Sequence, residues 1–479
     1  MNVFAMLESA ASTWPDRVAV IDEHGAMTFA ALHAEAVLLR EALVERGLTA
    51  GQGLGVLARN GRGFIIACFA GLGAGAVVMP LFHQTRRAEL VAQLAQTPLH
   101  AILDDRARED LLPQRGELMA YRWGTLRWTR LSADPSTPFV PHLPDAAFVR
   151  HTSGTTGRSK GVVVGHRAVW ARTAAARDAL QLGPGDVVAW VMPMAYHFIV
   201  SITMYVRYGV TIAVCPDMMA DSILDVALAS GATLLYASPL HIRMLAGDAS
   251  GRTVPSLRWV VSTSSGLPPD VAQAFTTRFG VPVRQLYGII ECGLPMGDLG
   301  PDAPEPASVG RALPGYQVGI LDDDGALRRA GEIGHLGVRG PGLFDGYLDP
   351  PQRSDDVLWH GWFMTGDLAV ADDTGRITVC GRRKSMINVA GHKVFPEEVE
   401  AVLGAIDGVA ASRVFGVPHP AMGEVVYAEV VARADVTLDL EALRRVCQQR
   451  LSGHKVPQRI TLVEQIATTG TGKVARAAP

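Results

Sequence analysis

The sequence predicts an α/β protein whose large N-terminal domain contains doubly wound sheets. Two observations support this prediction. Short apolar runs alternate with segments of helical periodicity through about the first half of the chain, and such alternation is typical of parallel sheets covered by helices. The chain of 479 residues is also 48% hydrophobic and 19% charged, which supplies a large core and excludes a disordered or collagen-like chain.

The expected elements follow one another in a regular order. Thr28 is placed to cap a helix, because apolar residues recur after it at helical spacing until Gly47. Residues 54–57 are then expected to form a buried strand, 64–70 a helix and 76–79 the next strand. Five further strands are expected at residues 101–103, 187–191, 211–214, 233–236 and 259–261.

The pattern changes after Gly310. Short strands at 318–321 and 337–338 are followed by turn residues, and they predict a small antiparallel sheet appended to the α/β body. Beyond Gly381, strand and helix patterns alternate closely and predict a compact α+β segment. We therefore expect an N-terminal domain at 1–381, a hinge at 382–385 and a small mobile C-terminal domain at 386–479.

Charge and cysteine usage exclude several classes of protein. With 44 basic and 47 acidic residues the formal charge is −3, so neither a nucleic-acid nor an anionic-membrane partner is expected. The five cysteines are scattered without a CxxC pair, which favours a reducing compartment over a zinc site or disulfide framework. The uncharged stretch 64–82 contains three glycines and a proline, which favours a buried helix and strand over a membrane span. Since the N-terminus shows no signal-peptide pattern, we expect a cytoplasmic protein.

The strongest local motif is TSGTTGRSKG at residues 152–161, directly after the apolar strand expected at 146–149. Its glycines allow backbone amides to close around an anion, its hydroxyls add donors, and Lys160 adds a positive charge. The loop is not a Walker A motif, because Lys160 is followed by Gly161 and not by serine or threonine. The pattern predicts polyphosphate binding, and the alternative is a flexible connector.

Several segments resemble, in order, the motifs of the AMP-forming adenylating enzymes, a superfamily of acyl-CoA synthetases, adenylation domains and luciferases. The loop 152–161 resembles their phosphate loop, and 287–291 (YGIIE) resembles Tyr-Gly-x-Thr-Glu. Residues 361–367 (GWFMTGD) resemble the Thr-Gly-Asp strand end, 381–384 (GRRK) the hinge segment and 469–473 (TGTGK) the C-terminal lysine loop. The resemblance spans essentially the whole chain.

The resemblance implies an ATP site. Tyr287 would lie along the adenine, and Asp367 would accept hydrogen bonds from both ribose hydroxyls. Arg382 would reach the ribose and a phosphate, and Glu291 would bind Mg²⁺, a hard cation that prefers carboxylate oxygen. The resemblance assigns further ATP contacts to Thr152, Ser153, Gly154, Thr155, Thr156, Gly157, Lys160, Ser264, Gly288 and Lys473, with Thr156 as a second Mg²⁺ ligand.

Lys473 is the catalytic residue that the resemblance implies. Attack of a carboxylate on the α-phosphate brings two anions together, so a mobile cation between them lowers the barrier. Lys384 occupies the family's hinge position, where rotation would exchange the Lys473 loop for the Gly391 loop and admit a thiol for the second half-reaction. Glu291 and His197 complete the set of catalytic candidates.

The acid pocket is expected at Tyr196, His197, Ser264, Ser265, Gly266, Gly288, Ile289 and Ile290. Ile290 stands where the family has threonine, and isoleucine cannot donate a hydrogen bond to the α-phosphate. Thr263 and Ser264 replace glycines, so their side chains narrow the pocket. Because Tyr196 and His197 fill the region where amino-acid-activating relatives place an aspartate, an α-amino acid is disfavoured. A small or aromatic acid is favoured over a long acyl chain.

These observations predict an ATP-dependent ligase that forms an acyl-adenylate, releases pyrophosphate and transfers the acyl group to the thiol of coenzyme A or of carrier-protein pantetheine. The expected partners are ATP, Mg²⁺ and a small-molecule acid. One alternative keeps the adenylation but uses a small oxyacid such as nitrite, with transfer to an aryl amine. An alternative of another class is a non-catalytic relative that acts as a binding protein.

Overall fold

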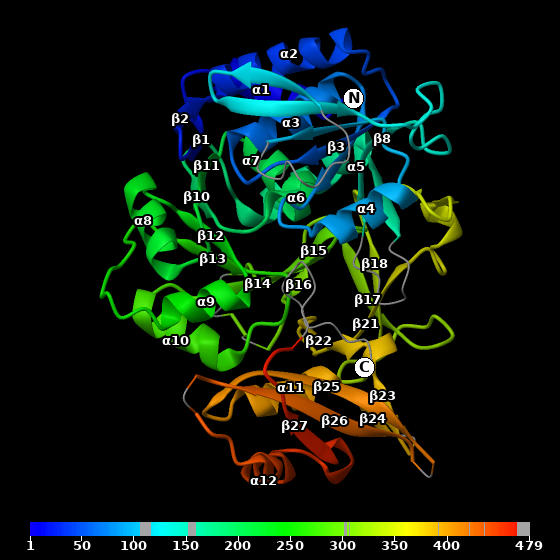
Figure 1. Ribbon diagram of the computed structural model, residues 1–479. Coiled ribbons are helices and arrows are strands. Elements are labelled where there is room, and N and C mark those ends of the chain that lie inside the picture. Colours follow the sequence, from blue (N-terminus) through cyan, green and yellow to red (C-terminus); the bar gives the residue numbers. More distant parts are fainter. Residues whose placement is uncertain are drawn as a thin grey trace. The chain divides into compact units, whose positions relative to one another are not determined.

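The computed structural model describes residues 1–105, 116–151, 160–300, 304–305, 307–390, 392–420, 422–434 and 436–466 (Figure 1). Its α-helices are α1 (Phe4–Thr13), α2 (Phe29–Glu45), α3 (Arg62–Gly73), α4 (Arg87–Gln96), α5 (His166–Leu180), α6 (Met194–His197), α7 (Thr203–Arg207), α8 (Ala220–Ser230), α9 (Pro239–Ala246), α10 (Pro269–Phe279), α11 (Pro396–Gly404) and α12 (Leu440–Arg450). A π-helical turn, Phe198–Ile202, joins α6 to α7.

The first nine-stranded sheet has a parallel centre and antiparallel edges. Its strands, in spatial order, are β16 (Arg311–Ala312), β15 (Gly293–Gly297), β14 (Val283–Ile289), β13 (Trp259–Ser262), β12 (Leu234–Ala237), β10 (Val187–Trp190), β11 (Thr211–Val214), β1 (Val18–Asp22) and β2 (Gly25–Thr28). The pairs from β14 to β1 are parallel, and β2, β15 and β16 pair antiparallel.

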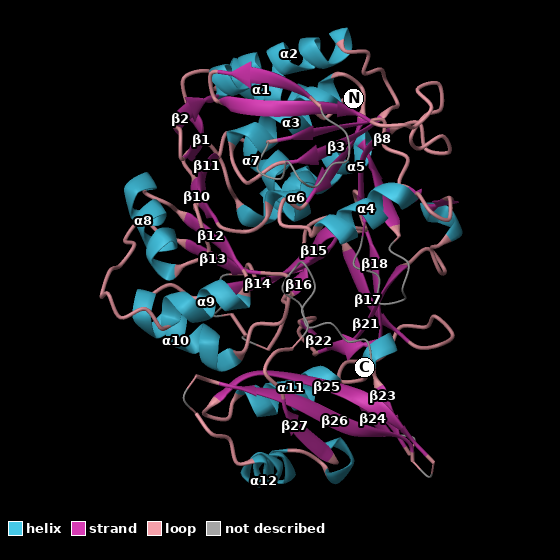
Figure 2. Cartoon of the chain, viewed as in Figure 1, coloured by secondary structure: helices cyan, strands magenta, loops and turns pink. Residues whose placement is uncertain are grey.

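The second nine-stranded sheet follows the same plan. Its order is β20 (Gln352–Arg353), β19 (Gly346–Tyr347), β9 (Gly161–Gly165), β8 (Ala146–His151), β4 (Val77–Leu81), β3 (Gly53–Leu57), β5 (Ala101–Asp104), β7 (Gly124–Arg130) and β6 (Glu117–Tyr121). Strands β8, β4, β3 and β5 pair in parallel. Figure 2 shows the helices that separate these strands along the chain, as the alternating sequence pattern predicts.

Local signals explain why these elements form where they do. The Thr28 hydroxyl accepts a hydrogen bond from the Ala31 amide at 3.2 Å and caps α2, so the predicted cap is confirmed. The apolar face of α2 is buried, as its periodicity predicts. The stretch 64–82 forms most of α3 and all of β4, and no helix among the described residues is long and apolar enough to cross a bilayer.

The antiparallel sheet and the C-terminal α+β segment are both present. The four-stranded sheet contains β17 (Gln317–Leu321), β18 (Gly334–Arg339), β21 (Phe363–Ala371) and β22 (Ile377–Arg382) in that order. The C-terminal sheet contains β24 (His392–Val394), β23 (Ile387–Val389), β26 (Gly423–Ala432) and β25 (Val409–His419), and β27 (Arg459–Leu462) pairs with β26. Helices α11 and α12 pack on this sheet through Val399, Leu403, Leu443 and Cys447.

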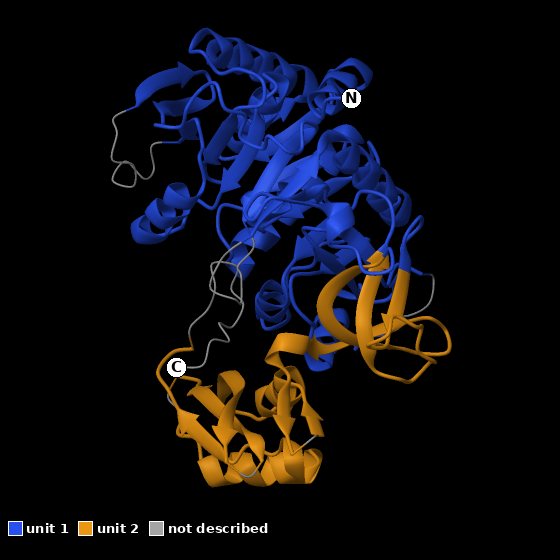
Figure 3. Ribbon diagram, turned by 90° about the vertical axis from the view of Figure 1, so that its right-hand side faces the viewer, with its two compact units in different colours: residues 1–152, 160–317, 339–361 blue, residues 153–159, 318–338, 362–479 orange. Residues whose placement is uncertain are grey.

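The chain divides into two compact units (Figure 3). Unit 1 comprises residues 1–152, 160–317 and 339–361 and holds both nine-stranded sheets. Unit 2 comprises residues 153–159, 318–338 and 362–479, and it holds the C-terminal sheet together with most of the four-stranded sheet. The hinge at 382–385 and the boundary that it sets between 1–381 and 386–479 stay a prediction, because they concern which parts move.

Candidate active site

Glu291 lies in the tight turn between β14 and β15, and three parts of unit 1 hold this turn. The Ile290 carbonyl accepts from Arg172 Nη1 at 3.0 Å. The Glu291 carbonyl accepts from the Phe344 amide at 2.7 Å, and the Cys292 carbonyl accepts from the Tyr316 hydroxyl at 2.8 Å. Because three successive carbonyls have donors from separate segments, the backbone that carries the Glu291 carboxylate is fixed.

Arg172 on α5 is deeply buried, with 1% of its surface exposed. Its Nε donates to the Gly342 carbonyl at 3.0 Å and its Nη2 donates to the same oxygen. Burial lowers the pKa of Arg172, and carbonyl oxygens, not a carboxylate, receive its hydrogen bonds. Arg172 therefore ties α5 and the Gly342 loop to the Glu291 turn.

Tyr287, Gly288, Ile289 and Ile290 belong to the same hairpin. Any side chain at Gly288 would approach the Gly293 carbonyl oxygen to 2.7 Å, so hairpin packing itself requires glycine there. The Ile290 residue is 9% exposed and lies directly before Glu291. The structure thus brings five predicted site residues together on one turn and the end of β14.

A cluster of aromatic rings surrounds the predicted acid-pocket residue His197 at the end of α6. The Trp190 ring stacks on Tyr236 at 5.3 Å between centroids, and the two belong to the paired strands β10 and β12. The His197 ring meets both of them edge-on at 5.6 Å. Tyr205 of α7 contacts Trp190 at 5.9 Å. The stacked and edge-on contacts pack these rings closely around His197.

The same cluster contains buried polar atoms. Trp190 Nε1 and the Tyr205 hydroxyl are buried and have no hydrogen-bond partner in the described part of the chain. Burial raises the pKa of both Tyr205 and Tyr236. The nearby Ser201 hydroxyl opposes this rise at each tyrosine, but it does not satisfy the Tyr205 hydroxyl as a hydrogen-bond partner. Buried donors without acceptors suit a polar ligand.

The loop after β13 carries the predicted residues Ser264, Ser265 and Gly266. Ser264 has a φ of +79°, a backbone conformation that favours glycine, so serine is strained here. Thr263 is 5% exposed and its amide donates to the Ala237 carbonyl at 3.1 Å. Ser265 and Gly266 are exposed. Strain at Ser264 agrees with the resemblance, which places glycine at this position.

Asp367 and Arg382 face each other across the antiparallel pair of β21 and β22 in unit 2. Arg382 Nε donates to Asp367 Oδ1 at 3.1 Å, and the Asp367 amide donates to the Thr365 hydroxyl at 3.1 Å. The Asp367 side chain is 7% exposed and that of Arg382 is 45% exposed. Lys384 is exposed in the short 3₁₀ turn Arg383–Ser385 that follows.

Several predicted residues need separate mention. Lys160 is exposed, and its Nζ lies 4.4 Å from the centre of the Tyr347 ring. No cluster of three potential metal ligands occurs among the described residues. A single carboxylate such as that of Glu291 is still compatible with Mg²⁺, because this ion takes few protein carboxylates and completes its coordination shell with phosphates and water. Seven predicted residues, Thr152, Ser153, Gly154, Thr155, Thr156, Gly157 and Lys473, lie outside the described residues.

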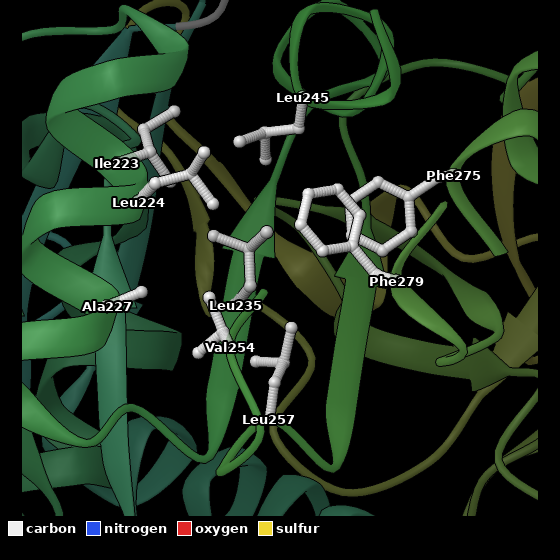
Figure 4. A pocket seen from close by; sticks show the side chains of 9 residues that line it. All are labelled: Ile223, Leu224, Ala227, Leu235, Leu245, Val254, Leu257, Phe275 and Phe279. Carbon is white, nitrogen blue, oxygen red and sulfur yellow. The ribbon is translucent and has the colours of Figure 1, made fainter. Parts of the chain in front are cut away.

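A small pocket elsewhere in unit 1 is apolar and contains none of the predicted site residues. Helices α8, α9 and α10 and strand β12 surround it, and Figure 4 shows its lining side chains pointing toward one another. Its lining consists of Ile223, Leu224, Ala227, Leu235, Leu245, Val254, Leu257, Phe275 and Phe279. These residues belong to one core cluster or pack on it, so the pocket is a packing gap in the core and does not suit a nucleotide.

Comparison with known proteins identifies the class. The family model "AMP-binding enzyme" matches residues 7–348, and "AMP-binding enzyme C-terminal domain" matches residues 398–473. The chain therefore belongs to the AMP-binding enzyme family, and the resemblance to the AMP-forming adenylating enzymes is confirmed. The predicted α/β fold with a small C-terminal α+β part is confirmed as well.

Individual relatives cover almost the whole chain. The sulfoacetate–CoA ligase of Cupriavidus necator is 29% identical over 98% of this chain and 96% of its own. The 2-succinylbenzoate–CoA ligase of a Geobacillus strain is 27% identical over 96% and 94%, and the long-chain-fatty-acid–CoA ligase of Yersinia pestis is 29% identical over 99% and 93%. ATP-bound MatB from Rhodopseudomonas palustris superposes with a TM-score of 0.86 at 25% identity, over 99% and 97% of the two chains.

Motif-based reasoning missed Arg172, Trp190 and Tyr236, and it also missed Arg150 of β8, whose Nη1 donates to the Tyr196 carbonyl at 2.7 Å. Arginine and aromatic residues are common, and none of these four stands in a recognisable spacing. The Arg172 contacts span 118 and 170 residues of sequence. The available signal was weak: Arg150 is a charged residue that follows four apolar residues in β8.

Proposed function

We propose that this protein is an AMP-forming acid–CoA ligase. In the first step an acid carboxylate oxygen attacks the α-phosphorus of ATP, the bond to the β-phosphate breaks, and pyrophosphate leaves. In the second step the sulfur of coenzyme A attacks the acyl carbon and AMP leaves. The observation that carries the proposal is the match of both family models, supported by full-length relatives that are CoA ligases.

The residues take roles that fit their surroundings. The fixed turn presents Glu291, which would hold Mg²⁺, and the ion supplies charge neutralisation at the phosphates when bound. Asp367, held by Arg382 and nearly buried, is suited to accept from two ribose hydroxyls. Lys473 would stabilise the charge that develops on the α-phosphate. The aromatic cluster beside His197 favours a small or flat acid.

Acid-dependent AMP release tests the proposal. Purified protein receives Mg·ATP with one acid at a time, with and without coenzyme A, and AMP and pyrophosphate are measured. The panel contains sulfoacetate, 2-succinylbenzoate, benzoate, a long-chain fatty acid, and nitrite with an aryl amine. We expect AMP with one small acid and an acyl-CoA product when coenzyme A is present. AMP release with nitrite alone would indicate a diazotising enzyme and not a CoA ligase. No AMP release with any compound of the panel would contradict both functions.

Ile290→Thr tests the departure beside Glu291. A threonine hydroxyl donates to the α-phosphate in the resembling motif, and one neutral hydrogen bond contributes about 0.5–1.5 kcal/mol. We therefore expect a rise of about 2–10-fold in the rate of adenylate formation, measured by pyrophosphate release. Ile290→Val is the matched control, because it keeps the branched shape and adds no hydroxyl. A large loss in the threonine variant alone would show that Ile290 shapes the acid pocket.

A further inference from the structure

Arg150 is a partly buried cation that none of the motifs explains. It stands near the end of β8, and Phe148, two residues earlier on the same face of the strand, stacks on Phe198. Arg150 Nη1 donates to the Tyr196 carbonyl at 2.7 Å, and the guanidinium carbon lies 4.7 Å from the centre of the Tyr196 ring. These two contacts hold the guanidinium in place beside α6.

The charge of Arg150 has no counterion in the described part of the chain. Its Nε is buried and lacks an acceptor, and Arg150 forms no ion pair among the described residues. Two buried arginines differ from it: Arg62 pairs with Asp22 at 2.6 Å, and Arg172 has an acceptor for Nε, Nη1 and Nη2. Partial burial of a cation also costs free energy unless an anion or several acceptors compensate. Arg150 therefore suits an anion that arrives from solution.

The nearby Glu291 carboxylate does not serve as the counterion of Arg150. The Glu291 carboxylate raises the pKa of Arg150 against the stronger lowering by burial, but it forms no ion pair with it. In the proposed function Glu291 serves a metal ion. The guanidinium has five donors in a planar fork and uses one, so it can bind a carboxylate or sulfonate through two parallel hydrogen bonds.

The surroundings of Arg150 are those of the predicted acid pocket. Tyr196, on which it stacks, precedes His197 in α6, and His197 contacts Trp190 and Tyr236. Trp190 Nε1 and the Tyr205 hydroxyl are further buried donors without a partner in the described residues. A ring-lined region with unused donors and one cation without an ion pair suits an acid that carries more acceptor oxygens than one carboxylate supplies.

We propose that the acid substrate of this protein carries a second anionic group, a carboxylate or a sulfonate, and that Arg150 binds this group. The inference rests on the proposed function and deepens it by naming the class of acid. Arg150 holds the non-reacting end, which leaves the other carboxylate to attack ATP. Sulfoacetate and 2-succinylbenzoate, named for two relatives, belong to this class, whereas long-chain fatty acids, named for a third, do not.

Matched acid pairs test the inference with wild type, Arg150→Gln and Arg150→Lys. The pairs are sulfoacetate with propanoate and 2-succinylbenzoate with 4-oxo-4-phenylbutanoate, and KM is measured separately for the acid and for ATP. We expect wild type to prefer the dianion of at least one pair by about 100-fold in kcat/KM, as expected for a bidentate charged contact. Arg150→Gln should raise KM for that dianion by about 10–100-fold and leave KM for ATP within about twofold. Arg150→Lys should recover part of the loss.

Three results would overturn it. The first is that wild type prefers the monoanion of each pair. The second is that Arg150→Gln raises KM for ATP and not for the acid, which would show that Arg150 binds a phosphate of ATP. Equal loss for both members of a pair would indicate a structural role only. Arg167→Gln, an exposed arginine on α5, is the control and should change neither KM.

A binding measurement separates this inference from the proposed function. Sulfoacetate, 2-succinylbenzoate and their monoanionic partners are titrated calorimetrically into wild type and Arg150→Lys without ATP. Binding of either by wild type that weakens about tenfold or more in the lysine variant supports the anion site even if no acid yields AMP. If neither dianion binds wild type better than its monoanionic partner, the inference fails whatever the enzyme activity.

Discussion

Lys473→Ala is expected to lower the rate of acyl-adenylate formation by about 10²–10³-fold, the range found when one group that stabilises developing charge is removed. The attacking carboxylate and the α-phosphate are both anionic, so the barrier depends strongly on a cation between them. ATP also contacts other residues, and its Kd should change by less than about threefold. Single-turnover AMP formation and equilibrium binding of ATP measure the two effects.

Arg459→Ala provides the control for this variant. Arg459 is an exposed cation of the same unit, at the start of β27, and its loss should leave the adenylation rate within about twofold if only the specific charge matters. Lys473→Arg should recover part of the rate. An unchanged rate in Lys473→Ala would contradict the catalytic role, which comes from the resemblance of residues 469–473, since Lys473 lies outside the described residues.

Arg172→Met is expected to produce the largest loss of stability, about 3 kcal/mol. The methionine fills a similar space but leaves the Ile290 and Gly342 carbonyls without their buried donor, and each such unpaired group costs about 1–3 kcal/mol. The urea midpoint of unfolding, followed by fluorescence, measures the change. The Glu291 turn would also loosen, so the folded variant should need more Mg²⁺ for half-maximal AMP formation.

Arg177→Met on the same helix is the matched control. The Arg177 side chain is 43% exposed and pairs with the neighbouring Asp178 at 3.3 Å, so its removal should cost less than about 1 kcal/mol. If Arg172→Met does not fold, Arg172→Lys keeps one cationic donor and should show the raised Mg²⁺ requirement with a smaller midpoint shift. Equal midpoints for Arg172→Met and Arg177→Met would contradict the structural role of Arg172.

The fold class was predictable from the sequence because its signals are local. The cap at Thr28, the apolar spacing of α2 and the short apolar strands each depend on residues that are neighbours in the chain. The same holds for the predicted phosphate loop at 152–161 and for the segment 287–291, since each motif is a contiguous run of residues. Family membership followed from these motifs, and the family models confirm it.

The surroundings of the site could not be predicted in this way. Arg172 donates hydrogen bonds to the Ile290 and Gly342 carbonyls, which are 118 and 170 residues away along the chain. Trp190 and Tyr236 meet only because β10 and β12 pair in register. The strain at Ser264 comes from its positive φ, and the residue types at 263–265 do not predict that backbone conformation.

The sequence by itself therefore determined the class of fold, the family and the residues proposed to bind ATP, because each depends on short, ordered motifs. Only the tertiary structure decided how the Glu291 turn is held and which donors near α6 remain without acceptors. Hydrogen bonds and burial are set by segments that folding brings together, and whether an arginine is paired depends on all of its neighbours at once. For this reason Arg150 becomes a candidate for acid recognition only when its surroundings are known.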